Sequence, residues 1–269
     1  MRAILGTLVV FVYVFLLAPF LVVAIASLEG SQALFYNFPP RQLSLAWYGE
    51  IPVKYFRAFG VSLAVGAVTA VVAGAIGTAA ALGLVRGRLR YAPLLQAAFR
   101  MPLQIPFVVT GVVFLQAYYR LVDVVGVNLA GRLPGMILAH VFVTIPYTVG
   151  TVSSVLVRQN PRFEEAAAAL GASPWSTFRR VLFPLVRPGI FAGILYAFII
   201  SFGDVPIAIF LAGSSTVTLP VEIFQSLQFD FNPALLALST LTVLFSLALV
   251  VVMQRVVGLD IVLRTGGNG

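Results

Sequence analysis

Two ionisable side chains stand within the long apolar stretches of this 269-residue sequence, and they are the first candidates for chemistry. Asp204 is flanked by Gly203 and Pro206, and His140 is the one histidine of the chain. An acidic side chain that faced lipid would be costly, so an acid at such a place indicates a function by default. Gly203 and Pro206 would also loosen a helix here and expose backbone carbonyls to a cavity.

Two roles are open for Asp204. Either it lines a polar path through the membrane together with Ser201, or it only bonds to a neighbouring helix or to a partner chain. For His140 we favour a hydrogen-bonded packing role over a proton relay, because no second titratable group is visibly paired with it.

Other chemistry is excluded by what the sequence lacks. Without cysteine the chain has no disulfide, no thiolate nucleophile and no cysteine-ligated metal. It has no H-E-x-x-H motif and no paired carboxylates in an apolar stretch, so an intramembrane enzyme has no credible catalytic set. Lys54 is the one lysine, and no G-x4-G-K-S/T loop is present to hold phosphates. We therefore expect no catalytic residue, no metal site and no cofactor on this chain, and any ATP must be hydrolysed by a partner.

Composition identifies the class of protein that carries these residues. Hydrophobic residues make up 60% of the chain and charged residues 10%, whereas about a quarter of a soluble protein is charged. The chain is therefore an integral membrane protein. Its net charge of +8 does not indicate nucleic-acid binding, because the arginines lie at the ends of apolar runs, where membrane topology places them.

The elements that must position the candidate residues are membrane-spanning helices, each of which needs about 20 apolar residues. We expect an all-α fold with about six spans, the fifth interrupted near Asp204. For the first span a cleavable signal peptide is the alternative, but the apolar run at 3–22 exceeds the usual core of about 7 to 15 residues, which favours a retained anchor. The expected spans are residues 3–28, 57–86, 101–119, 133–157, 190–211 and 231–254.

Small residues lie along one face of the second span. Gly66, Ala70, Gly74 and Gly77 follow each other at helical spacing. Such a face lets another helix approach closely. We therefore expect helix packing at these four positions, and no binding site.

The positions of the positive charges indicate orientation. Six spans put both termini on one side, and with the termini inside 12 of the 17 Lys and Arg residues fall on that side. Because cytoplasmic loops carry an excess of such residues, both termini, the arginine-rich stretch 86–100 and residues 158–188 are expected in the cytoplasm. No internal repeat is visible, so the inverted-repeat architecture of many secondary transporters gains no support.

The 158–188 segment is a polar island between two apolar runs. Asn160 is placed to cap a helix that begins at Pro161, and Gly171 to end it in the left-handed conformation. Ser173 and Pro174 start a second short helix, which carries Trp175, Phe178 and Leu182 on one face and which Pro184 is expected to stop. The segment is thus predicted to be a pair of short helices with an apolar face.

Such a pair suits either a groove on another protein or the lipid headgroups, and the pattern alone supports both about equally. Its sequence, however, resembles a known motif. Residues 165–167 (EAA), then three residues, Gly171, nine residues and 181–184 (VLFP) are similar to the EAA loop of permease subunits of ATP-binding-cassette (ABC) importers. That loop reads EAA, three residues, G, nine residues, I-x-L-P. Val181 and Phe183 depart from it, and both are apolar.

The resemblance extends beyond this segment. The arginine-rich stretch and the residues that follow it, 86–109, and His140 with 145–147 (IPY), are similar to the corresponding stretches of the family. The resemblance implies the MetI-like type I permease fold. The implied parts are a single transmembrane permease domain over 1–269, a family-like core at about 58–255, an N-terminal anchor helix at 3–28 and a cytoplasmic coupling loop at 158–188.

In that family the EAA loop seats against a cytoplasmic ATPase, which implies the same contact here. ATP and Mg²⁺ would be held by that partner, expected in two copies. A second permease subunit and a periplasmic substrate-binding protein would complete the importer in the lipid of the bacterial inner membrane, with no role for nucleic acid. The residues implied at the ATPase contact are Glu164, Glu165, Ala166, Ala167, Gly171, Ser173, Trp175, Phe178 and Pro184.

For the cargo, residues 201–206 (SFGDVP) and 218–224 (TLPVEIF) look most like the spermidine/putrescine branch of these permeases. Asp204 would suit a cationic amine, and Ser201 and Asp204 would then line the translocation path. The alternative function is a self-sufficient ion-coupled carrier or channel. That class would need coupling-ion residues in several spans, whereas only Asp204 and His140 are ionisable within the expected ones.

Overall fold

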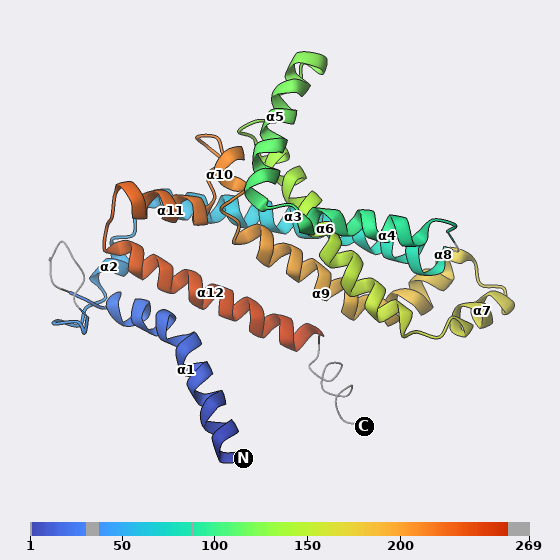
Figure 1. Ribbon diagram of the computed structural model, residues 1–269, viewed down its shortest axis with the longest axis horizontal. Helices are drawn as coiled ribbons and strands as arrows, with labels where there is room; N and C mark the ends of the chain where they lie inside the picture. The colour runs from blue at the N-terminus through green and yellow to red at the C-terminus, as the bar shows by residue number, and fades with distance from the viewer. Residues whose placement is uncertain (1, 31–37, 88, 258–269) are drawn as a thin grey trace. The chain divides into compact units, whose positions relative to one another are not determined.

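The computed structural model describes residues 2–30, 38–87 and 89–257, and over these residues the protein is helical (Figure 1). The described part contains no strand beyond one isolated bridge between Glu29 and Leu43. Six of its helices are long and apolar enough to cross a membrane, which confirms the all-α, six-span expectation. Those candidate spans are Leu5–Ala26, Val53–Arg86, Phe107–Val125, Leu133–Val157, Pro174–Phe202 and Ala234–Val252.

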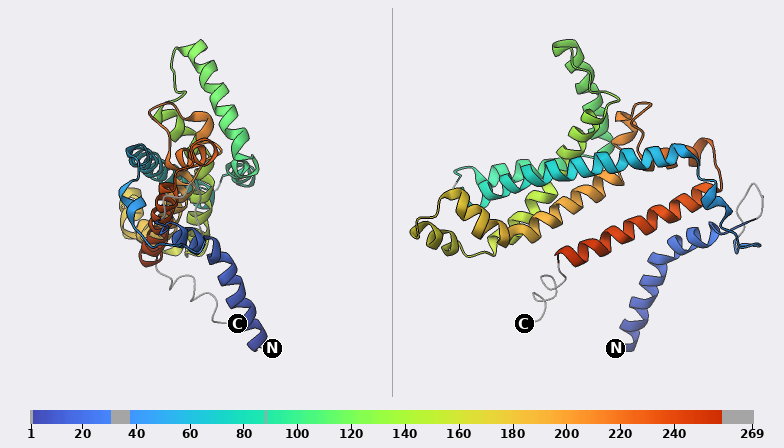
Figure 2. Two further views of the ribbon diagram at one scale, coloured as in Figure 1. Left: turned by 90° about the vertical axis from the view of Figure 1, so that its left-hand side faces the viewer. Right: turned by 180° about the vertical axis from the view of Figure 1, so that it is seen from behind.

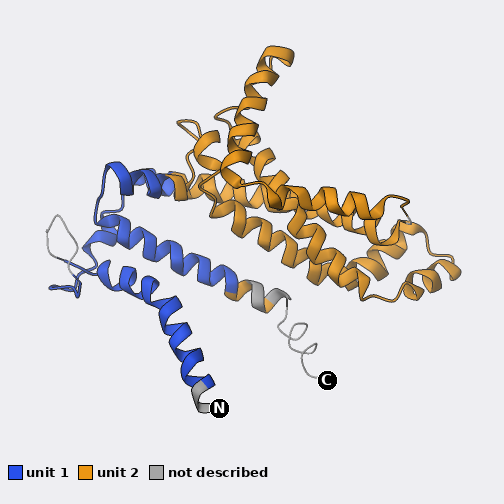
Figure 3. Ribbon diagram, viewed as in Figure 1, with its two compact units in different colours: residues 1–57, 222–250 blue, residues 58–221, 251–269 orange. Residues whose placement is uncertain are grey.

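The chain forms two compact units (Figure 3), one of residues 1–57 and 222–250 and the other of residues 58–221 and 251–269. The first unit contains α1 (Arg2–Ala26), α2 (Ala46–Gly49) and most of α12 (Ala234–Val257). Most apolar side chains of α1 from Leu5 onward are exposed, as expected of a helix that meets lipid.

Polar contacts join the start of α3 (Val53–Arg86) to α11 (Leu219–Phe229) inside the first unit. Lys54 Nζ lies 3.0 Å from Glu222 Oε1, and the Tyr55 hydroxyl donates to Ser226 Oγ at 2.9 Å. No helix was predicted between the expected fifth and sixth spans, 190–211 and 231–254, so α11 was missed. Its Pro220 suits a first helical turn, where a missing N–H costs nothing.

In the second unit, α6 (Leu133–Val157) packs against α9 (Phe183–Phe202), and α3 runs beside both (Figures 1 and 2). The predicted small-residue face of α3 makes these contacts. Gly66 faces the Phe198 ring, Gly74 faces Ile194 and Gly77 faces Thr148, each without room for a methyl group unless the neighbour shifts. The packing prediction for α3 is confirmed.

The third span differs from the prediction of 101–119. Residues before it form α4 (Ala92–Arg100), where a loop was expected, and a short 3-10 turn, η1 (Met101–Gln104). The span itself is α5 (Phe107–Val125), which starts after Pro106 and ends at Gly126 in the left-handed conformation, φ 73°. Pro102 and Pro106 lack the N–H that an α-helix needs, so one continuous helix cannot run through them. Because α5 continues past Arg120, the exposed Asp123 lies in a membrane-length helix, whereas Asp204 lies just beyond the end of α9 at Phe202.

Candidate functional site

The first half of the 158–188 segment is α7 (Arg162–Ala169), which starts one residue later than predicted. Asn160 Oδ1 accepts a hydrogen bond from the Arg162 N–H at 3.0 Å, and this is the expected cap. Gly171 has φ 80°, and the Ala172 N–H reaches back to the Ala167 carbonyl at 3.0 Å. This closed helix end requires the left-handed residue, so the predicted role of Gly171 in ending the helix is confirmed.

The second half begins as predicted with α8 (Pro174–Thr177), where Ser173 Oγ accepts from the Ser176 N–H at 3.3 Å. The predicted stop at Pro184 is wrong. A π-helical turn, η2 (Phe178–Leu182), follows α8, and the Phe183 N–H bonds to the Phe178 carbonyl five residues back. This wider turn accommodates Pro184, which has no N–H and whose ring would clash with a carbonyl four residues back. As a result, Pro174–Phe202 is one helical stretch of 29 residues that links α8 directly to α9.

The two short helices lie at one end of α6 and α9, and α10 (Ala208–Leu211) lies at the other end of α9 (Figure 2). Large apolar side chains on them are exposed: Phe163 by 55%, Leu170 by 89% and Trp175 by 68%. Of the residues predicted at a partner contact, those that are exposed are Glu165, Ala166, Gly171, Ser173, Trp175 and Pro184, the last on the first turn of α9.

Other predicted contact residues face their own chain, and Ala167 is half-buried. Phe178 is also half-buried and packs on the buried cluster of Leu156, Leu182 and Val186. Glu164 is 25% exposed, and its Oε1 lies 2.9 Å from Nε of Arg86. Phe178 and Glu164 therefore hold the segment in place from within.

Arg86 is a residue that sequence reasoning gave no role at this site. Besides its ion pair with Glu164, its Nη2 donates to the backbone carbonyls of Leu156 at 3.3 Å and Gln159 at 3.0 Å. Its place as the last residue of α3 is readable from the sequence. Its partners, 70 to 78 residues further on, are not.

The second candidate region is the helix break at Asp204. The Gly203 N–H makes the final bond of α9, to the Ile199 carbonyl at 3.0 Å. Pro206 cannot continue the helix because it has no N–H. Asp204 Oδ2 then accepts from the N–H groups of Ile207 at 2.9 Å and Ala208 at 2.8 Å, so the carboxylate caps α10. The predicted interruption of the fifth span is confirmed.

His140 on α6 completes this region. Its Nε2 lies 3.2 Å from Asp204 Oδ2, and the two side chains are 0% and 1% exposed. Because Oδ2 already accepts two backbone N–H groups, Nε2 is the donor of this bond. The expectation that His140 has no titratable partner is wrong, although its hydrogen-bonded role is as expected.

Three buried polar atoms around the break have no hydrogen-bond partner among the described residues. They are Asp204 Oδ1, His140 Nδ1 and Ser201 Oγ. Asp204 therefore does bond to a neighbouring helix and also keeps a spare acceptor. A path-lining role for Ser201 and Asp204 stays a prediction.

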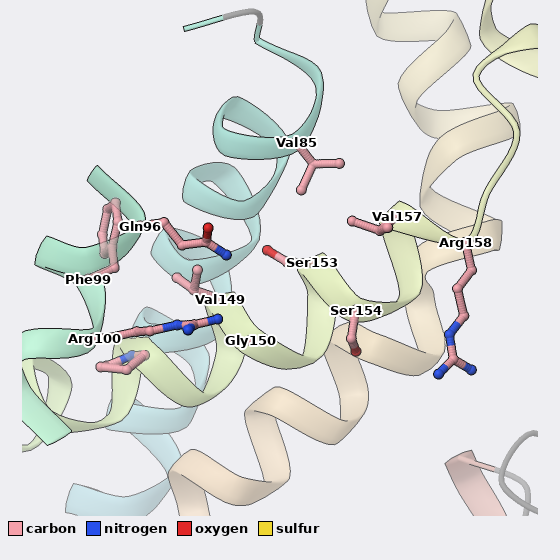
Figure 4. A pocket seen from close by; sticks show the side chains of 11 residues that line it. Val85, Gln96, Phe99, Arg100, Val149, Gly150, Ser153, Ser154, Val157 and Arg158 are labelled. Atoms are coloured by element: carbon pink, nitrogen blue, oxygen red, sulfur yellow. The ribbon is translucent and has the colours of Figure 1, made fainter. Parts of the chain in front are cut away.

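A cavity of about 310 Å³ lies between α3, α4 and α6, near the 158–188 segment (Figure 4). Gln96 and Ser153 point toward each other across it, and Arg100 reaches in beside them. No acidic residue lines it, so it suits a cationic ligand poorly. Over the described residues, no group of three or more His, Cys, Asp or Glu side chains could hold a metal ion.

Comparison with known families supplies the identification. Residues 73–261 match the family described as the binding-protein-dependent transport system inner membrane component. The chain belongs to this family. It is a multi-span permease subunit of an ABC importer, and the resemblance inferred from the EAA-like pattern is confirmed at the level of the family.

Two relatives cover most of the chain. The putrescine transport system permease protein PotI of Escherichia coli (strain K12) is 34% identical over 85% of this chain and 82% of its own length. The spermidine/putrescine transport system permease protein PotC of Haemophilus influenzae is 31% identical over 82% of this chain and 87% of its own length.

A solved structure supports the fold independently. A chain of a bacterial ABC transporter involved in the import of the acidic polysaccharide alginate superposes with a TM-score of 0.76 over 94% of this chain and 95% of its own. The two sequences are 14% identical, so this similarity concerns the fold alone.

Proposed function

We propose that this permease forms one half of the translocation pathway of its importer and is driven by a separate ATPase that docks on the 158–188 segment. The docking proposal rests on the exposure of three large apolar side chains of the two short helices, Phe163, Leu170 and Trp175, which we call the apolar face of the segment. This face stands on a rigid support, because both of its helices are capped and α8 is continuous with α9. A partner that moved the segment would therefore move α9 with it.

The lipid headgroups are the competing partner for this face. A headgroup anchor needs only an apolar side and neighbouring charges. It does not need a closed turn at Gly171 or a direct helical link to α9. Those features, together with the EAA-like pattern, favour a protein groove that receives the segment in one fixed orientation.

The cargo that we propose is a polyamine or a related cationic amine, received from a periplasmic binding protein and passed between this chain and a second permease subunit. Its support is the identity with two permeases named for putrescine and spermidine. The fold does not decide the cargo, since the alginate transporter shares it. The cavity of Figure 4 is lined by Arg100 and Arg158 and by no acidic residue. Because these positive charges would repel a cationic amine, we do not place the amine there.

Reconstitution tests this function. The chain is placed in liposomes together with the binding protein, with and without the partner ATPase and the second permease. Uptake of labelled putrescine and ATP hydrolysis are both measured. We expect uptake only with the complete set and ATP, and competition by spermidine but not by sulfate. Uptake by this chain alone, without ATP hydrolysis, would instead establish the ion-coupled carrier.

The proposed orientation, with both termini and the 158–188 segment in the cytoplasm of a bacterial inner-membrane protein, has its own test. Because the chain has no cysteine, single cysteines at Leu170 (89% exposed) and Val124 (82% exposed) report unambiguously. These positions lie beyond opposite ends of α6. A membrane-impermeant thiol reagent added outside right-side-out vesicles should label Val124→Cys and leave Leu170→Cys unlabelled, and the reverse result would contradict the orientation.

A further inference from the structure

We infer that Arg86 is a positioning residue of the importer: it ties the 158–188 segment to α3 and α6, so that motion of the segment is passed to three helices instead of one. The inference rests on the proposed docking of the ATPase. It concerns a side chain that bonds to Glu164 and to two backbone carbonyls at the end of α6, and that would act through the segment that it holds.

The geometry places one guanidinium among three helix ends. Arg86 is the last residue of α3, and Glu164 lies in the first turn of α7. Nε contacts Glu164 Oε1 at 2.9 Å, while Nη2 contacts the carbonyls of Leu156 and Gln159, at and just beyond the last turn of α6, at 3.3 and 3.0 Å. The planar guanidinium offers several donors in a fixed arrangement, and these contacts use two of its nitrogens.

The charges suit the helix ends that they meet. The last carbonyls of a helix lack partners within it and carry partial negative charge, which a cation satisfies. An acidic side chain is favoured in a first turn, where Glu164 lies. Arg86 and Glu164 are also only 22% and 25% exposed, so water screens this pair less than it would screen a fully exposed one.

The apolar cluster beneath the ion pair ties the second short helix to the same place. Leu156 of α6, Leu182 of η2 and Val186 of α9 are buried together, with Val85 of α3 and Phe178 packed against them. α8 is therefore held by packing and by its continuity with α9. α7 has no such continuity, since non-helical residues connect it to α6. It also packs against α8 and η2, and Arg86 joins it to α3 and to the end of α6.

Neighbouring arginines provide a contrast. Arg90 lies over the Tyr91 ring at 5.5 Å, and no hydrogen bond or ion pair of its side chain occurs within the described part of the chain. Removing the charge of Arg90 changes the local electrostatics by the same amount without releasing α7. Arg90→Gln is therefore the matched control for Arg86→Gln.

A distance measurement in the cysteine-free chain tests the tie directly. Spin labels are attached at Ile76→Cys, an exposed position of α3, and at Leu170→Cys, at the end of α7. We expect a narrow distance distribution in the parent and in Arg90→Gln, and a clearly broader one in Arg86→Gln at unchanged thermal stability. An equally narrow distribution in Arg86→Gln would overturn the inference.

The complete importer provides the functional readout, which is the amount of cargo transported per ATP hydrolysed. We expect Arg86→Gln to lower this ratio at least threefold while the ATPase still co-purifies, and Arg86→Lys and Glu164→Gln to lower it less. An unchanged ratio in Arg86→Gln would overturn the inference. If the ATPase fails to co-purify with the parent chain, the proposed docking is wrong, and the spin-label comparison still decides the tie.

Exchanging the charges of residues 86 and 164 separates the contribution of the ion pair from that of the contacts with the backbone carbonyls. In the double variant Arg86→Glu with Glu164→Arg the pair is restored, but a carboxylate then faces the carbonyls of Leu156 and Gln159. We expect the transport ratio to stay low. Full recovery would show that the pair alone matters and would overturn the tie to α6.

Discussion

The helix break at Asp204 and the 158–188 segment lie at opposite ends of α9 in one unit, but they place polar and apolar groups in opposite ways. At the break, Asp204 and His140 are buried and bonded to each other. In the segment, Leu170 and Trp175 are large, apolar and exposed. The break buries polar side chains, which are usually exposed to water, and the segment exposes large apolar side chains, which are usually buried.

This difference indicates what each region depends on. Buried polar groups must find partners within the protein, so the break is shaped by its own chain and its side chains contribute to stability. Exposed apolar side chains contribute little to the stability of their own chain, and on a rigid support they indicate a surface that binds a partner. Substitutions at the break should therefore change stability first, and substitutions in the segment should change coupling first.

The largest effect is expected for Asp204→Ala. Its removal leaves the N–H groups of Ile207 and Ala208 and His140 Nε2 without their acceptor in a buried place. Loss of one partner from a buried pair costs about 3 to 5 kcal/mol. We expect a large fall in the melting temperature of the purified chain.

Two variants sharpen this result. Asp123→Ala removes an exposed acid from α5 and should leave the melting temperature near that of the parent. Asp204→Asn keeps an oxygen that accepts the two N–H groups, so it should cost less than Asp204→Ala. If Asp204→Asn is stable and abundant but transports poorly, the path-lining role gains support. If it transports normally, Asp204 is only structural.

An intermediate effect is expected for Gly171→Val, for which the chain contains a matched partner. Gly171 and Gly126 both end helices with positive φ, 80° and 73°, and both have open space where a Cβ would stand. A side chain at either position costs strain of about 1 to 2 kcal/mol. Both variants should lose similar stability, but only Gly171→Val should lower ATPase co-purification and transport per ATP.

A third variant separates strain from surface change at this glycine. Gly171→Asn places a side chain at the same point, but asparagine tolerates the left-handed conformation better. It should keep most of the coupling. Equal loss of coupling in Gly171→Val and Gly126→Val would mean that general destabilisation is responsible, and the contrast between the two regions would fail.

The features that the sequence predicted are those encoded within a few residues. Asn160, Ser173 and Gly171 carry their capping chemistry locally, and the fourth span was placed at its observed bounds, Leu133–Val157. The interruption at Gly203 and Pro206 is equally local.

The features that sequence reasoning missed depend on contacts between distant residues or on how a helix adapts. His140 and Asp204 are 64 residues apart, and Arg86 and Glu164 are 78 apart, so no local pattern pairs them. Pro184 predicts a helix stop by itself, but the packing of Leu182 and Val186 keeps the chain helical through a wider turn. Tertiary packing thus overrides a local signal.

The smallest effect on stability, and a large one on association, is expected for Leu170→Ser and Trp175→Ser. Both side chains are mostly exposed, at 89% and 68%, so replacing them should change the free energy of unfolding by no more than about 0.5 kcal/mol. If they fill a groove on the ATPase, affinity should fall about tenfold or more, as for an apolar anchor at an interface. Val124→Ser, at 82% exposure beyond the other end of α6, is the control and should leave affinity unchanged.

Two binding measurements check this prediction. In the first, the ATPase is titrated onto the permease in nanodiscs. In the second, the permease alone is titrated with anionic vesicles. Loss of vesicle binding with unchanged ATPase affinity would assign this face to the lipid headgroups. The segment would then bind no partner protein, and the contrast with the break would fail.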